Sequence, residues 1–132
     1  YFQTQPALQE QIQLASNAVC NELSVLPDLR MRGLTLVEGG GTARALTSLL
    51  TREERAPIIP RTDVIQLKDR LLTMTPQAIR RLNPKALSGR EDICSAALII
   101  LDTVMEYFGF EAFVASSGGL RHGLALAAAD AL

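Results

Sequence analysis

The sequence lacks the features that mark several common classes of protein. Of its 132 residues only Cys20 and Cys94 are cysteines, too few for a disulfide framework and not spaced as metal ligands. Neither sign of charge dominates, and the net charge of −1 gives no field that would attract nucleic acid or an anionic membrane. The longest apolar run, Ala96 to Leu101, is far shorter than the roughly 18 residues of a membrane span, and no signal-peptide pattern opens the chain. We therefore expect a protein of the reducing cytoplasm with no DNA or membrane partner.

The residues that are present suffice for one folded domain. A chain of 132 residues fills one compact domain rather than two, and 48 % hydrophobic residues can supply its core. Tyr1-Phe2-Gln3 resembles the end of a cleaved expression tag as much as a native start, so we set residues 1–5 aside as a tag remnant or disordered start. We expect the domain to comprise residues 6–132.

The spacing of apolar residues predicts a mostly helical protein. Apolar residues three and four apart predict helices over residues 8–23, 42–50, 62–72, 75–83 and 120–132. The clearest helix follows the capping box Ser88-Gly89-Arg90-Glu91 and ends at Gly109. Its apolar stripe is wide enough for burial on more than one side, and comprises Ile93, Ala96, Ala97, Ile100, Leu101, Val104, Met105 and Phe108.

Two short segments rich in β-forming residues, 34–37 and 110–116, predict strands. Helices separate these segments, which favours a parallel pair joined by crossover connections. Residues 52–61 are charged and contain Pro57 and Pro60, so we expect a loop there. The fold class predicted is α/β, mostly helical, with two short parallel strands.

Each predicted strand runs into a glycine-rich turn that precedes a helix. Such a turn lets a phosphate approach the backbone, and the helix start offers free N–H donors and a partial positive charge. The first turn, Gly39-Gly40-Gly41-Thr42, is neither a P-loop nor a dinucleotide fingerprint, and a simple tight turn is the alternative. The second, from Ser116 to Arg121, would lie beside it if the strands are neighbours. We predict phosphate binding by Gly39, Gly40, Gly41, Thr42 and Arg121.

The chain shows no convincing catalytic set of its own. His122 is the only histidine, and Ser116, Ser117 and Asp130 invite comparison with a nucleophile triad. No Gly-x-Ser-x-Gly elbow frames either serine, and helical spacing does not aim these side chains together. We therefore predict no catalytic residue and no metal ligand in this chain.

Several motifs, in order and spacing, resemble those of the exopolyphosphatase/guanosine-pentaphosphate phosphatase (Ppx/GppA) family. The segment Leu36-Val37-Glu38-Gly39-Gly40-Gly41-Thr42-Ala43 resembles the family's Gly-Gly-Thr-alanine segment. Arg90-Glu91-Asp92 matches its Arg-x-Asp motif, and Ser116 to Gly123 is similar to its Ser-x-x-Gly-Leu-Arg-Glu-Gly signature. The resemblance covers about residues 8–132 and implies part of a ribonuclease-H-like, actin-like ATPase fold.

The resemblance also implies an activity and a place for some of the residues. Family members remove terminal phosphates from polyphosphate or guanosine pentaphosphate with a metal ion, Mg²⁺, and a carboxylate base in a cleft between two domains. By position Arg121 would lie near the phosphate side of that cleft, whereas we assign Arg90 a structural role. Glu38 stands where the family usually has a small residue, and His122 replaces the usual glutamate.

The family's amino-terminal motifs, including its phosphate loop and catalytic glutamate, have no counterpart in this sequence. We therefore expect a carboxyl-terminal fragment that binds phosphate at most, holds no Mg²⁺ itself and is inactive alone. Its partners would be the amino-terminal part of the enzyme and, because one strand edge would lose its neighbours, further copies in a homo-oligomer. A non-catalytic binding or regulatory module is one alternative; half of a sugar or acetate kinase is another, which the Leu-Arg-x-Gly signature disfavours.

Overall fold

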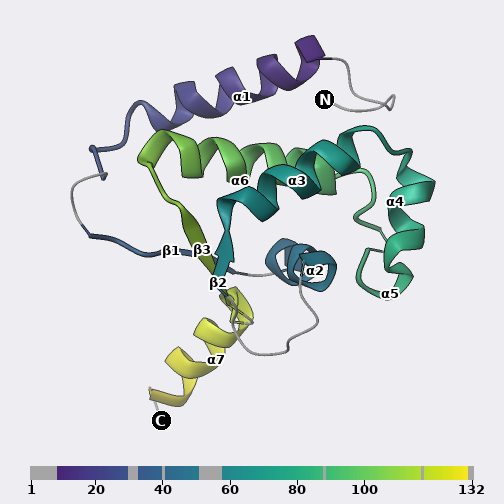
Figure 1. Cartoon of the computed structure of the whole chain (residues 1–132). Helices are drawn as coiled ribbons and strands as arrows, with labels where there is room; N and C mark the ends of the chain where they lie inside the picture. Colours follow the sequence, from purple (N-terminus) through teal and green to yellow (C-terminus); the bar gives the residue numbers. More distant parts are fainter. Residues whose placement is uncertain are drawn as a thin grey trace.

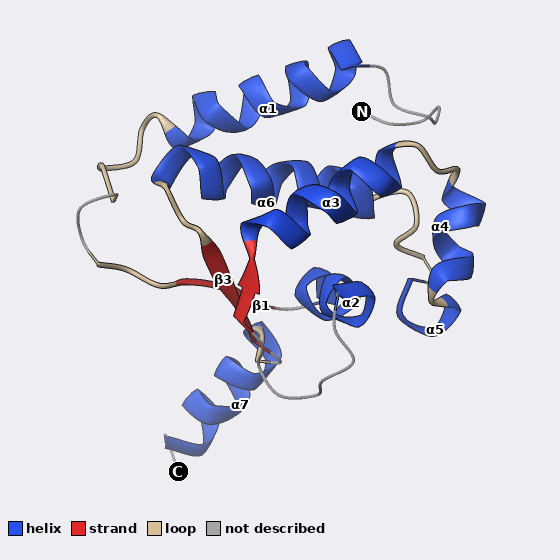
Figure 2. Ribbon diagram, in the orientation of Figure 1, coloured by secondary structure: helices blue, strands red, loops and turns tan. Residues whose placement is uncertain are grey.

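The computed structural model describes residues 9–29, 33–39, 41–50, 58–87, 89–116 and 118–130, with backbone only for residues 41–44, 84, 120, 121 and 130. The described elements form a mostly helical α/β domain with a small sheet at its centre (Figures 1 and 2). In chain order they are α1 (Gln9–Leu23), β1 (Leu36–Gly39), α2 (Gly41–Leu50), β2 (Ile58–Pro60), α3 (Arg61–Leu72), α4 (Pro76–Leu82), α5 (Pro84–Leu87), α6 (Cys94–Phe108), β3 (Ala112–Ser116) and α7 (Leu120–Asp130).

The sheet has three strands in the order β1-β3-β2. The predicted parallel pair is confirmed, since β1 runs parallel to β3 with Leu36 opposite Phe113. The predicted loop over residues 52–61 is wrong at β2, which pairs antiparallel with β3. Two isoleucines favour the extended conformation there, and the edge position tolerates Pro60, which has no N–H to donate. Residues 51–57 lie outside the described residues.

The two faces of the sheet differ in burial. On the inner face the half-buried Leu36 lies opposite Phe113, which is 1 % exposed, and Phe113 lies opposite the buried Ile59. On the outer face the corresponding row is Val37, Val114 and Ile58, of which Val37 is 58 % and Ile58 72 % exposed. Only the inner face therefore contributes to the main core.

Helix α6 lies at the centre of the helical layer. Helices α1 and α3 both pack against it, and α2 packs against β1 and β3 (Figure 1). The predicted inward stripe of α3 is confirmed, because its four members are all buried: Val64, Leu67, Leu71 and Leu72. Helix α1 has no buried residue among those described, and its predicted stripe is only half buried where Ile12 and Ala15 meet Leu72 and Ile99.

The start of α6 differs from the prediction. The helix begins at Cys94 rather than after a capping box, because Gly89 has a left-handed φ of +73° that no helix continues through. Glu91 instead accepts a hydrogen bond from the N–H of Arg90 at 2.9 Å. Hydrogen bonds from backbone N–H groups, chiefly its own, lower the pKa of Glu91. Ile93 and Ile100 were expected to face inward, yet each is about half exposed.

A charged cluster crosses the interface between α3 and α6. Asp102 is 6 % exposed and accepts hydrogen bonds from Arg61 Nε at 2.8 Å and Lys68 Nζ at 2.5 Å. Arg61 also donates to the exposed Glu106 at 2.9 Å. Burial alone would lower the pKa of Arg61, but the hydrogen bonds and charges of Asp102 and Glu106 together raise it. The cluster fixes the first turn of α3, directly after β2, against α6.

Candidate functional site

The structure brings the two glycine turns together, as predicted from the sequence. In the parallel β1–β3 pair the last register position places Gly39 opposite Ser116, so both strands end at the same edge of the sheet. The approach is close, because a Cβ added to Gly39 would lie 3.0 Å from the carbonyl oxygen of Gly118. A side chain at residue 39 would therefore require the second turn to move.

The second turn uses its own backbone donors to hold its shape. The N–H of Gly118 donates to Ser116 Oγ at 3.1 Å, and the N–H of Gly119 donates to His122 Nδ1 at 3.2 Å. His122 thereby closes the first turn of α7 from its third position, as the glutamate of a capping box does. Those two N–H groups are occupied, so an anion between the turns would need other donors.

The predicted phosphate-binding residues fall at the ends of three elements. Gly39 ends β1, Gly41 and Thr42 begin α2, and Arg121 is the second residue of α7. Thr42 was expected to cap α2, but the helix already begins at Gly41. Gly40 and the side chains of Thr42 and Arg121 lie outside the described part of the structure. The phosphate site therefore stays a prediction.

Two residues that depart from the family motifs take distinct positions. Glu38 alternates with Gly39 along β1, is half buried and lies opposite the buried Ala115; its Oε2 atom is shielded from solvent. A carboxylate at this position lowers the positive potential near the turn. His122 replaces a glutamate but keeps the backbone bond that such a residue makes at a helix start.

The described residues contain no group of three or more His, Cys, Asp or Glu side chains arranged to hold a metal ion. Glu38 is the one carboxylate in the strand that leads into the first turn. Ser116 and His122 each bond to backbone N–H groups, and no bond joins them to one another in the described structure. None of the described helices is long and apolar enough to cross a membrane.

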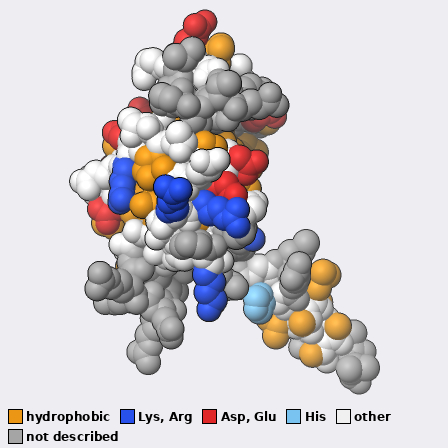
Figure 3. All heavy atoms as spheres, turned by 90° about the vertical axis from the view of Figure 1, so that its right-hand side faces the viewer, with side chains coloured by type: hydrophobic (Ala, Val, Ile, Leu, Met, Phe, Trp, Pro, Cys, Tyr) orange, Lys and Arg blue, Asp and Glu red, His pale blue; other side chains and the backbone are white. Residues whose placement is uncertain are grey.

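The last helix, α7, extends away from the rest of the molecule (Figures 1 and 3). All of its described side chains, residues 122–129, are exposed, including Leu124 at 61 % and Leu126 at 67 %. Strand β1 lies at the edge of the sheet and pairs on one side only among the described strands. The candidate site is therefore flanked by an apolar helix and an open strand edge.

This chain has part of the actin-like ATPase fold, because it superposes on solved Ppx/GppA structures that have this fold. The family model described as the Ppx/GppA phosphatase family matches residues 1–131, so the chain belongs to that family. A comparison with curated proteins finds no match.

Solved structures of the family superpose closely despite low identity. A Ppx/GppA family member from Aquifex aeolicus has 17 % identity and a TM-score of 0.86, with 99 % of this chain and 44 % of that one covered. An exopolyphosphatase-like protein has 21 % identity and a TM-score of 0.84, covering 99 % and 46 %. An exopolyphosphatase from Cytophaga hutchinsonii has 19 % identity and a TM-score of 0.83, covering 100 % and 46 %. The chain thus spans less than half the length of these structures.

Two features of the described structure had no counterpart in the site predicted from sequence. The cluster around Asp102 has one visible signal, an aspartate within an otherwise apolar helix. The other is an open pocket between α2 and α3, which joins residues distant in sequence and left no local motif.

Proposed function

We propose that this chain forms the phosphate-contacting side of a Ppx/GppA phosphatase that removes the terminal phosphate of polyphosphate or guanosine pentaphosphate. The observation that carries the proposal is the parallel register that sets Gly39 beside Ser116, in a chain of this family. This register places the start of α2 and the start of α7 at one edge of the sheet. Helix starts supply N–H donors and partial positive charge to an anion.

In the proposed reaction, water attacks the terminal phosphorus and the bond to the bridging oxygen breaks, releasing orthophosphate and a chain shorter by one phosphate. The backbone of Gly41 and Thr42 would hold phosphate oxygens, and Arg121 would neutralise their charge. Mg²⁺ and a carboxylate base would be supplied by parts of the family fold outside this chain. This chain would thus position the substrate without activating the water.

The isolated chain should bind phosphate chains without hydrolysing them. Incubation with Mg²⁺ and either polyphosphate or guanosine pentaphosphate should release no orthophosphate, because the family's phosphate loop and catalytic glutamate have no counterpart in this sequence. Inorganic triphosphate should bind, and Arg121→Ala should weaken binding by about 1.5–3 kcal/mol, or roughly 10- to 150-fold, through loss of a charge-assisted hydrogen bond. Calorimetry measures the binding, and a colorimetric phosphate assay measures turnover.

Arg81→Ala provides the matched control, since Arg81 is an exposed arginine on α4. If Arg121→Ala and Arg81→Ala weaken binding equally, triphosphate is attracted only by the positive charge of the surface and not by a specific site. Turnover by the purified chain would overturn its assignment as a non-catalytic part. Binding with no activity, even when the remaining parts of a family phosphatase are added, would favour a binding or regulatory module.

We further propose that the open edge of β1 and the exposed face of α7 are contact surfaces for the rest of the enzyme or for a second copy. An unpaired strand edge and exposed leucines both favour association. The isolated chain should therefore sediment as a dimer or larger species at micromolar concentration. Val37→Lys on the edge strand, where Val37 is already exposed, should shift the population toward monomer; a monomeric parent chain would contradict the proposal.

A further inference from the structure

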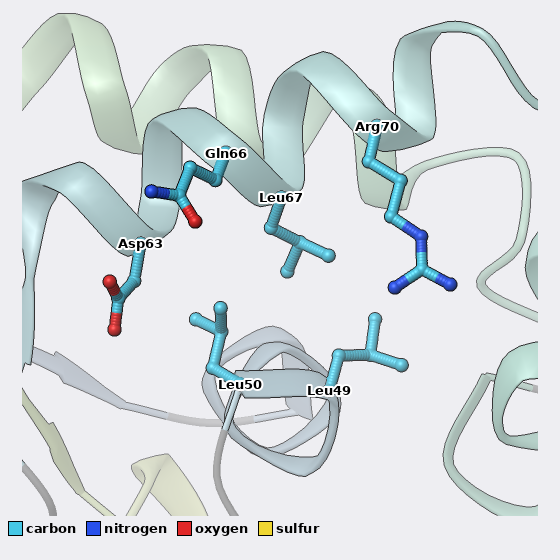
Figure 4. Close-up of a pocket in the computed structure, with 6 residues that line it drawn as sticks. All are labelled: Leu49, Leu50, Asp63, Gln66, Leu67 and Arg70. Atoms are coloured by element: carbon cyan, nitrogen blue, oxygen red, sulfur yellow. The ribbon is translucent and has the colours of Figure 1, made fainter.

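A second, separate hollow lies at the far end of α2 from the predicted phosphate turn. It has a volume of about 320 Å³ and lies between the last turn of α2 and the side of α3 that carries Leu67 (Figure 4). Its lining residues are Leu49, Leu50, Asp63, Gln66, Leu67 and Arg70. Because α2 rises by about 1.5 Å per residue over its ten residues, the two places are about 15 Å apart.

The pocket has an apolar floor and charges of opposite sign at its two ends. Leu67 is 5 % exposed and points from α3 toward the half-buried Leu49 and Leu50. Asp63 lies at the end near Leu50, whereas the guanidinium of Arg70 lies at the end near Leu49 (Figure 4). Seven residues separate the two charged positions along α3, which corresponds to about 10 Å.

The charged groups of Asp63 and Arg70 form no ion pair with other side chains in the described structure. Arg61 and Lys68 of the same helix pair with Asp102, but the side chain of Arg70 makes no ion pair or hydrogen bond within the described ranges. The carboxylate of Asp63 accepts only a long bond of 3.5 Å from its neighbour Thr62. Both groups are therefore available to a ligand.

We propose that this pocket binds a small zwitterion whose apolar body separates an ammonium group from a carboxylate by about 10 Å. The ammonium group would pair with the carboxylate of Asp63. The carboxylate would pair with Arg70 as a charge-assisted contact, and the body would lie on the three leucines. A volume of about 320 Å³ lies at the lower end of the range of small-molecule sites.

The test uses 8-aminooctanoate as the probe, because its extended length matches the spacing of the charges. Titration into the ¹⁵N-labelled full chain should give saturable shifts of the backbone amides of residues 49–50 and 63–70. Octanoate and octylamine, which each lack one charge, should bind at least about threefold more weakly. Equal binding of octanoate would remove the role of Asp63, and shifts confined to other residues would overturn the site.

Matched variants separate the pocket from general surface charge. Arg70→Gln and Asp63→Asn should each weaken 8-aminooctanoate at least about threefold. Arg81→Gln on α4 and Asp69→Asn, an exposed carboxylate on α3, make the same charge changes outside the pocket and should leave the affinity unchanged. A thermal unfolding scan of each variant identifies any that fails to fold. If one of these variants does not fold, Leu49→Glu tests the site instead. It should abolish the amide shifts if the ligand packs on the leucines of the pocket.

Discussion

Asp102→Ala should lower the free energy of unfolding by about 3 kcal/mol, near the lower end of the range for breaking a buried ion pair. The substitution leaves Arg61 and Lys68 without the carboxylate that neutralises them, and their side chains are only 24 % and 18 % exposed. The loss stays at the lower end because Arg61 keeps Glu106 and both cations reach some solvent. Urea denaturation followed by circular dichroism measures the change.

Glu106→Ala is the matched control, because it removes a carboxylate that binds the same arginine from the solvent side. The Glu106 side chain is 71 % exposed, and exposed ion pairs contribute at most about 1 kcal/mol. If both variants lose the same free energy, burial of Asp102 is not what makes its pairing matter. If Asp102→Ala is as stable as the parent, the cluster orients α3 without stabilising the fold.

Phe113→Ala should cost about 3–5 kcal/mol, the range for removing a buried aromatic side chain from a core. Phe113 is 1 % exposed and lies in β3, the central strand of the sheet, with Leu36 and Ile59 as its two strand partners. The cavity would therefore loosen both strand pairs at once. Since small domains are stable by only about 5–15 kcal/mol, chemical unfolding should shift to much lower denaturant concentration.

The control for Phe113 is Val37→Ala on the outer face of the same sheet. Val37 is 58 % exposed and packs beside Val114, so the expected loss is below about 1 kcal/mol. Similar losses for both variants would mean that the outer face is buried in solution, for example by a second copy. The same experiment at two protein concentrations separates that case from a core that tolerates the cavity.

The sequence predicted the helices well where local signals act alone. Thr75 caps α4, with its Oγ1 accepting a hydrogen bond from the N–H of Ala78 at 3.3 Å, and the four inward residues of α3 are all buried. Gly109 ends α6 in a left-handed conformation, as a glycine after an apolar stripe indicates. Each of these features depends on residues within one or two turns of each other.

Features that depend on distant partners were missed. Strand β2 is three residues long, contains a proline and exists because β3 offers it an edge, so no local pattern revealed it. Asp102 lies in a largely apolar helix, and its two cationic partners belong to α3, 41 and 34 residues away in the sequence. The juxtaposition of the two glycine turns was predictable, because parallel strands joined by helices end at one edge.

The contact between the two turns also bears on how this family can change in evolution. A Cβ at residue 39 would lie only 3.0 Å from the carbonyl oxygen of Gly118, which is too close for an unstrained contact. A substitution at residue 39 is then tolerated only if the backbone at Gly118 shifts, and that shift would carry the start of α7 with it. The two turns should therefore show epistasis, with changes in one acceptable only alongside particular changes in the other.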